Sequence, residues 1–343
     1  MTLDARRPMP LVTSGVACLL MACGLVSAQP GPSVRPVPKF QEETLVGRQV
    51  AVGLDDTVIM HNRFGNILVQ GSTYAEAGIS AELIAGGDSK TDARDFVHQM
   101  ALAVGTAGRK VSISINCPEN GKATEFQSNF TLNLPACALL RIENTYGDVT
   151  VDGVNASVLV RNRFGSASVY NCRAADITNA FGDVNVAGIE ERVEVDGRFG
   201  NVNARSVQGR IHISNENGAL RLAGGNGQIQ LENTLGDLSV TSSHGRFKIA
   251  GNHGNVTFTQ SAPTADTVLA TCRNGAIQLN LPDNPSTQIT ARAGRGKIST
   301  GIPDARPDAY GNDGQSLTCT LGLARSAFEL ETFSGDITIN TAP

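Results

Sequence analysis

The chain contains 343 residues, of which 41% are apolar and 17% are charged, and its formal net charge at pH 7 is −4. This length favours roughly two domains, and the apolar content, which can bury a core, excludes global disorder. The weakly acidic balance argues against a nucleic-acid-binding protein, and no internal apolar run is long enough to span a membrane. The 37 glycines, together with few aromatic residues, favour short strands joined by tight turns.

The first 22 residues have the pattern of a signal peptide. Two arginines precede an apolar stretch from Leu11 to Cys23, which is too short for a stable membrane span. Two endings remain open: cleavage after Ala28, behind an ordinary small-residue site, or lipidation of Cys23, because Leu20–Cys23 is similar to a bacterial lipoprotein box. We therefore expect an exported protein that is lipid-anchored in the cell envelope, periplasmic or secreted. It would contact a membrane only through the lipid of Cys23.

Residues 23–46 are rich in proline and predict an extended linker ahead of a folded body at 47–343. Export would also permit disulfides. The cysteines of the body are odd in number and scattered, so they do not form a disulfide framework, and their pairing is left open. They are Cys117, Cys137, Cys172, Cys272 and Cys319.

The first part of the body has a loose pattern. His61–Ile67 contains a phenylalanine–glycine turn that recurs later in the chain. Apolar residues at helical spacing predict a short helix over 92–104. Alternation of apolar and polar residues predicts strands over Val111–Asn116 and Phe130–Leu134.

Residues 144–258 are built on a nine-residue unit. A turn residue, mostly glycine, opens each unit, and a polar–apolar–polar–apolar sequence follows it. Two columns of apolar residues result, one from Val149 to Val256 and one from Val151 to Phe258. Alternation this regular predicts strands with one buried face. The glycines of the most regular stretch are Gly200, Gly209, Gly218, Gly227, Gly236, Gly245 and Gly254.

Alternate units differ, and this difference sets the length of one coil. An asparagine lies three residues before five of the seven alternate turns, and in the earlier units an aromatic residue lies one residue before the turn. Similar residues that recur every 18 positions are expected to stack in a parallel β-solenoid, because each residue then lies above its equivalent one coil earlier. We therefore predict an all-β fold, a single-stranded parallel β-solenoid (β-helix) with about 18 residues per coil, right-handed by the general rule for parallel crossovers. The residues of these structural ladders are Asn144, Asn162, Asn179, Asn215 and Asn233, with Tyr146, Phe164, Phe181 and Phe199.

Beyond residue 258 the same pattern resumes at wider spacing. It recurs at Asn274–Ile277, Gly296–Ile298 and Ser334–Ile339. Between them, Ile302–Gln315 is rich in Pro, Asp, Asn and Gly, which predicts a surface loop.

Three segments carry a resemblance to a known family. Phe130–Pro135, Leu140–Val149 and Phe328–Ile339 resemble the bacterial putative-adhesin family, which comprises secreted or envelope-associated proteins with β-strand repeats and a domain of unknown function. The resemblance covers residues 47–341. It implies a β-solenoid in the cell envelope, and it implies no established catalytic residues.

We expect no catalytic, cofactor or metal site. Ala223–Ile229 is similar to the calcium-binding nonapeptide of β-rolls, but Ile229 stands where an aspartate must bind the ion. Asp148 and Asp183 lie in one column two coils apart, roughly 9.6 Å by the strand spacing, a separation that would suit inverting glycoside hydrolysis. Because aspartate after a turn glycine is ordinary turn chemistry, we favour a structural role for both.

The two outer faces of the predicted solenoid differ. One carries short polar side chains, from Thr150 to Thr257, that could dock a glycan. Beside the other, Arg192, Arg210 and Arg246 form a basic edge that could bind an anionic surface or polymer, unless nearby glutamates neutralise it. The expected function is that of a non-enzymatic cell-envelope protein, adhesin-like or scaffolding, with an unknown envelope partner. The alternative is a carbohydrate-active β-helix enzyme of the polysaccharide lyase or hydrolase type.

Overall fold

The computed structural model describes residues 39–341, except 119–124, 263, 304 and 311–312. The chain divides into two units, 1–37 and 38–343, of which only the second lies in the described range. The predicted signal peptide and most of the predicted linker therefore fall outside the described residues. The folded part begins earlier than predicted, because residues 40–46 belong to a strand and not to the linker.

The described residues form an all-β fold with one short helix, as predicted. The first part comprises β1 (Phe40–Ala51), β2 (Thr57–Phe64), β3 (Ile67–Gly71), β4 (Glu76–Gly87), α1 (Lys90–Gln99), β5 (Ala101–Ala107), β6 (Lys110–Asn116) and β7 (Glu125–Leu134). The middle comprises β8 (Leu139–Tyr146), β9 (Val149–Asp152), β10 (Ser157–Phe164), β11 (Ala167–Tyr170), β12 (Ala174–Phe181), β13 (Val184–Ile189), β14 (Arg192–Phe199), β15 (Val202–Asn217), β16 (Leu220–Ala223), β17 (Asn226–Leu235), β18 (Leu238–Thr241), β19 (His244–His253), β20 (Val256–Thr259), β21 (Thr267–Asn274) and β22 (Ile277–Leu281). The last part comprises β23 (Thr287–Arg295), β24 (Ile298–Thr300), β25 (Asp308–Tyr310), β26 (Gly314–Leu321), β27 (Ser326–Ser334) and β28 (Ile337–Thr341).

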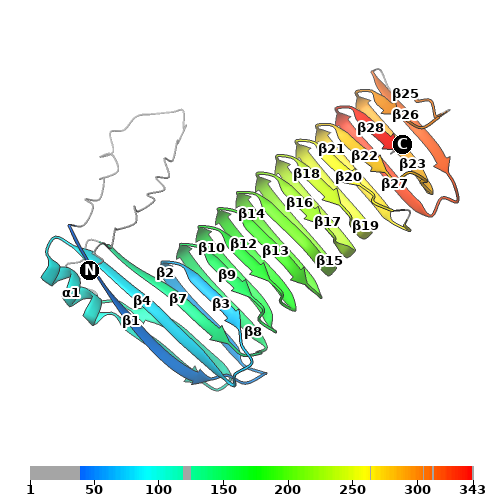
Figure 1. Ribbon diagram of the computed structural model, residues 1–343. Coiled ribbons are helices and arrows are strands. Elements are labelled where there is room, and N and C mark those ends of the chain that lie inside the picture. The colour runs from blue at the N-terminus through cyan, green and yellow to red at the C-terminus, as the bar shows by residue number, and fades with distance from the viewer. Residues whose placement is uncertain (1–38, 119–124, 263, 304, 311–312, 342–343) are drawn as a thin grey trace, which may run out of the picture. The chain divides into compact units, whose positions relative to one another are not determined.

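The middle strands form two stacks of parallel strands (Figure 1). One stack runs β9–β11–β13–β15–β16–β18–β20–β22, and the other runs β8–β10–β12–β14–β15–β17–β19–β21. The long strand β15 contributes its first half to one stack and its second half to the other. Paired residues lie 18 positions apart in most of these pairs, as Val184 does from Val202. Where one residue is missing, Val158 pairs with Ala175, and the nearby turn residue Asn171 takes a positive φ of 52°.

The core lies between the two stacks. Every residue of the two predicted apolar columns, Val149 to Val256 and Val151 to Phe258, is buried. The polar residues between them point outward. Alternation along each strand therefore confirms the prediction of strands with one buried face.

The two ends depart from parallel pairing, and here the prediction of a purely parallel fold is wrong. At one end β4 pairs antiparallel with both β1 and β7, and at the other end β23 pairs antiparallel with β26. β4 and β7 lie in a long insertion between the stacking partners β3 and β9, β23 and β26 lie in another between β22 and β28, and β1 precedes the first of the parallel strands. Because an insertion can fold back on itself, the pairing inside it follows local hairpins and not the repeat.

The helix is shorter than predicted. It ends at Gln99, and the apolar residues of 101–104 belong to β5, which pairs antiparallel with β6 across a turn at Gly108. Three residues of α1 are buried, Ala93, Phe96 and Val97, so the helix covers the first end of the core. No helix among the described residues is long and apolar enough to cross a membrane.

Glycine at the turns is required by the stacking itself. A Cβ atom on Gly165 would lie 2.2 Å from the carbonyl oxygen of Gly147, its equivalent in the preceding repeat. Gly200 and Gly218 stand in the same relation to their own predecessors. The opposite edge repeats the arrangement, since a Cβ on Gly227 would lie 2.0 Å from the Gly209 oxygen. Two such columns, one at each edge, account for the nine-residue spacing of glycine in the sequence.

Candidate functional site

The asparagines of the predicted column form hydrogen bonds to the backbone of the turns. All five side chains are at most 5% exposed. The amide of Asn179 donates to the carbonyl oxygens of Gly182 in its own turn (2.8 Å) and Gly165 in the preceding one (3.1 Å). Asn215 and Asn233 make the same pair of bonds. These side chains hold backbone groups and face no solvent-accessible site.

The aromatic column is a stack of rings at the same edge. Tyr146, Phe164, Phe181 and Phe199 follow one another at ring-centroid distances of 4.8–5.0 Å, with planes within 10° of parallel. Sequence reasoning missed that Phe64 extends the stack, at 5.2 Å from Tyr146. The shared Phe-Gly turn was the available signal, but 82 positions separate these two rings.

The post-turn aspartates bind backbone groups. Asp148 accepts the N–H of Ser166 (2.7 Å), and Asp183 accepts the N–H of Asn201 (2.8 Å), in each case from the following repeat. Asp237 does the same for Asn255. The column thus joins successive repeats, which is the structural role that the sequence favoured.

The predicted basic edge is interrupted by one uncharged residue. Arg192 on β14 pairs in register with Arg210 on β15, whose next partner on β17 is Gln228, and Gln228 in turn pairs with Arg246 on β19. Arg192 also lies 3.7 Å from Glu194 on its own strand, which neutralises it. The structure therefore separates the three predicted arginines into one paired and two unpaired side chains.

A shallow groove contains the two unpaired arginines. Its lining residues occupy register positions on three neighbouring strands, with Thr267 of a fourth strand at one end, so it runs across the strands. The 18-residue repeat already places His212, Gln230 and Lys248 in one outward column beside the arginines, but sequence reasoning did not include Gln228 and did not predict a groove. The outward side chains of this cationic groove are Arg210 and His212 on β15, Gln228 and Gln230 on β17, and Arg246 and Lys248 on β19.

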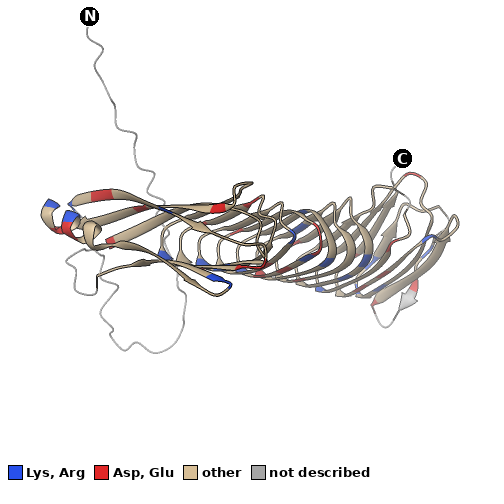
Figure 2. Ribbon diagram, turned by 90° about the horizontal axis from the view of Figure 1, so that it is seen from below, with Lys and Arg blue, Asp and Glu red and all other residues tan. Residues whose placement is uncertain are grey.

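The charges around the groove are unevenly distributed. Glu232 lies beside it on β17 and accepts a hydrogen bond from the Gln230 amide (2.6 Å). Among the described residues no ion pair reaches Arg210, Arg246 or Lys248, whereas Arg141, Arg192 and Arg198 of the stacks each pair with a glutamate. Figure 2 shows acidic and basic residues interspersed elsewhere along the stacks. The groove is therefore a local excess of positive charge.

Acidic residues precede the groove in the same outward column. Asp176 pairs in register with Glu194, which pairs with His212. Burial, followed by repulsion from Glu194, raises the pKa of the Asp176 carboxyl. An anionic ligand would therefore be repelled from β12 and attracted toward β15–β19.

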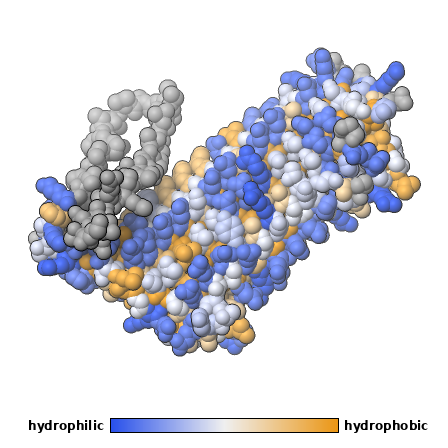
Figure 3. Space-filling view, in the orientation of Figure 1, coloured by the Kyte–Doolittle hydropathy of each residue, from blue (hydrophilic) through white to orange (hydrophobic). Residues whose placement is uncertain are grey.

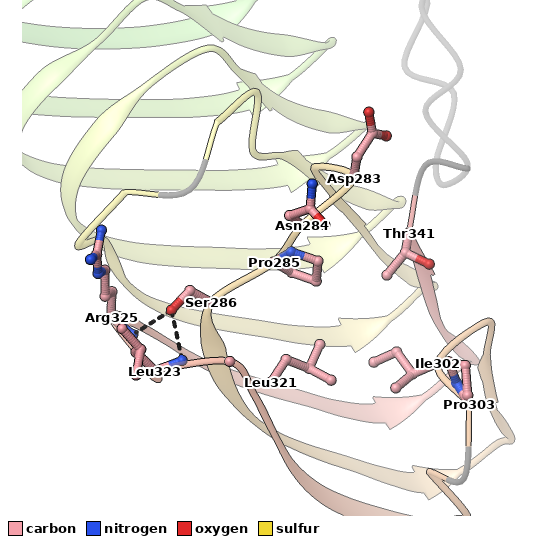
Figure 4. A pocket seen from close by; sticks show the side chains of 11 residues that line it. Asp283, Asn284, Pro285, Ser286, Ile302, Pro303, Leu321, Leu323, Arg325 and Thr341 are labelled. Atoms are coloured by element: carbon pink, nitrogen blue, oxygen red, sulfur yellow. Dashed lines mark hydrogen bonds between the residues drawn. The ribbon is translucent and has the colours of Figure 1, made fainter.

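A second hollow lies near the last strands (Figure 4). Its apolar lining includes Ile302, Leu321 and Pro285. Its central hydroxyl, Ser286 Oγ, accepts the backbone N–H of Leu323 (3.1 Å) and is therefore already bonded. Hydrophilic and apolar residues are mixed over the visible face (Figure 3), and no cluster of three or more metal-ligating side chains occurs among the described residues.

The cysteines of the body are free thiols in the structure. Cys137 and Cys172 are buried, and burial raises the pKa of each thiol to about 11. A thiol with so high a pKa is almost entirely protonated at neutral pH, so neither is a reactive nucleophile.

Comparison with known proteins places these features in a family. The family model described as Toastrack DUF4097 matches residues 92–340. No curated protein matches the chain.

The solved structures that resemble the chain have low TM-scores and low sequence identity. A putative adhesin from Parabacteroides merdae is 9% identical with a TM-score of 0.33, over 88% of this chain and 97% of that one. A putative lipid binding protein from Parabacteroides distasonis is 9% identical with a TM-score of 0.35, over 87% and 97%. A putative cell adhesion protein from Clostridium sporogenes is 12% identical with a TM-score of 0.22, over 88% and 100%.

Proposed function

The chain belongs to the Toastrack DUF4097 family, and we propose that it is an exported, non-enzymatic binding protein, adhesin-like or scaffolding, that holds an anionic partner of the cell envelope. The observation that carries this proposal is the cationic groove. Arg210, Arg246 and Lys248 are exposed there on one sheet face, without an ion-pair partner among the described residues. Exposed positive charge gathered on one face attracts anionic ligands and speeds their association.

The proposal includes a finer architecture. The protein would be a right-handed parallel β-solenoid with 18 residues in each regular coil. The support is the parallel pairing of residues 18 positions apart, as in Arg210 with Gln228. The hand rests on the general rule for parallel crossovers.

A binding role agrees with the state of the candidate acids. Asp148 and Asp183, the pair considered for glycoside hydrolysis, each use an oxygen to bind the backbone of the next repeat. A general acid or base must reach the atom it protonates or deprotonates, and these carboxylates are committed to the turns. Export would follow from the signal peptide, with anchoring through Cys23.

Retention on a polyanion tests the proposed function. The mature protein would be applied to heparin-agarose and eluted with a salt gradient. The double variant Arg210→Gln/Arg246→Gln should elute at clearly lower salt than the parent, because screening weakens exposed charge attraction over about 10 Å at 0.1 M salt. The control, Arg205→Gln/Arg221→Gln, removes the same charge from exposed positions elsewhere. Equal elution of the groove variant and the control would contradict the proposal.

A further inference from the structure

We infer that the groove binds a linear polysaccharide with an anionic group on every second sugar, lying across the strands; this inference rests on the proposed function. The two columns of the groove both alternate. One reads Arg210, Gln228, Arg246, and the other reads His212, Gln230, Lys248. In both, an uncharged amide separates two basic side chains.

The spacing of the columns fits such a chain. Neighbouring parallel strands lie about 4.8 Å apart, so Arg210 and Arg246, two strands apart, are separated by roughly 9.6 Å along the stack. One sugar of an extended β-linked chain is close to one strand spacing in length. Successive sugars would therefore meet successive strands, and the basic side chains would meet every second sugar.

The middle strand is suited to an uncharged sugar. Gln230 donates to Glu232 at 2.6 Å, which fixes the amide and leaves its oxygen to accept a hydroxyl or an amide N–H. Gln228 makes no side-chain hydrogen bond among the described residues and is exposed. Because Glu232 adds a negative charge to this strand, an anionic sugar placed here would be repelled.

The groove is about three sugars long. On one side the register partners are Thr267 and Leu269 of β21, which carry no charge. On the other side Arg192 and Glu194 of β14 form an ion pair. The charged positions therefore accommodate a charged, an uncharged and a second charged sugar. Since the site is a depression that runs across strands, it fits a chain better than a flat lipid surface.

Ligands with different charge patterns test this inference. Titration calorimetry would compare a hyaluronan hexasaccharide, in which charged and uncharged sugars alternate, with a galacturonate hexasaccharide, in which every sugar is charged. Vesicles of phosphatidylglycerol provide a lipid surface. We expect hyaluronan to bind at least tenfold more tightly than galacturonate, and Arg210→Gln/Arg246→Gln to remove binding of both.

Glu232→Gln is the matched variant. It keeps an acceptor for Gln230 and removes the central negative charge, so it should tighten galacturonate binding and leave hyaluronan binding and the melting temperature nearly unchanged. Equal or tighter binding of galacturonate by the parent would overturn the inference while leaving the proposed function intact. Preference for the vesicles would overturn it in favour of a membrane. Failure of every anionic probe, heparin included, would overturn both proposals.

Discussion

Replacing Gly165 by alanine should destabilise the protein much more than a typical glycine substitution. Gly165 has a φ of +125°, which side chains of L-residues rarely adopt. Its added Cβ would lie 2.2 Å from the Gly147 oxygen and 2.9 Å from Asp148 Oδ1. These contacts are too short to persist, so the turn must move away from the preceding repeat.

The cost follows from what that movement breaks. Backbone strain at such a position amounts to about 1–3 kcal/mol. Displacement of the turn also weakens the bonds from Gly165 N–H to the Phe181 oxygen (2.9 Å) and from Ser166 N–H to Asp148 (2.7 Å). Each is worth about 1 kcal/mol. The expected loss is therefore about 3–5 kcal/mol, or of the order of 10 °C in melting temperature.

Gly153→Ala is the matched control. Gly153 also has a positive φ, +70°, but the nearest atom to its added Cβ is 3.9 Å away. It should lose only about 1–2 kcal/mol, the cost of the left-handed conformation. Urea unfolding followed by circular dichroism would compare both variants with the parent. If Gly165→Ala and Gly153→Ala unfold at the same urea concentration, the close approach of stacked turns is not what demands glycine.

Three further predictions concern single positions. Asn179→Ala removes two hydrogen bonds to turn carbonyls and should lower the free energy of unfolding in urea by about 2–3 kcal/mol. Asn226→Ala, at an exposed side chain, should lower it little. Equal effects of the two variants would contradict a stabilising role of the asparagine column. Burial and a neighbouring glutamate raise the pKa of Asp176, so the folded chain binds this proton more tightly than the unfolded chain, and stability falls as pH rises above the unfolded pKa. Asp176→Asn should therefore raise the melting temperature at pH 7 and leave it unchanged near pH ~3, below the unfolded pKa; a lower melting temperature at pH 7 would refute this sign. Mass spectrometry of the mature protein should find a lipid on an N-terminal Cys23, and a chain that begins at the alternative cleavage site would rule out the anchor.

The regular repeats could be predicted because their information is local. Burial of one face imposes the two-residue alternation at Val149 and Val151, and the close approach of stacked turns imposes glycine at Gly200 and Gly218. Both requirements recur in every repeat, so one sequence contains many copies of the same signal. The ends carry no such repetition. Phe40–Ala51 pairs with β4 through an antiparallel register that no periodicity encodes.

The groove could be predicted only in part. The sequence singled out Arg210 and Arg246 by their column, but it could not show that Glu194 approaches Arg192 and leaves the other two unpaired, since that depends on side-chain conformation. Lys248 and Gln230 are unremarkable as single residues. The 18-residue repeat places them in a column beside these arginines, but the structure is needed to show that together they line one groove.

The stacking of repeats that bond only to their immediate neighbours has a consequence for how such chains change length. Residues 202–219 form one full repeat, and removal of them would join position 201 to Leu220, whose strand carries the same inward apolar alternation as the strand lost. The remaining repeats would still match. A gene encoding this chain can therefore gain or lose whole repeats by duplication or deletion, and each such event alters the separation of the antiparallel ends by about one strand spacing, ~4.8 Å.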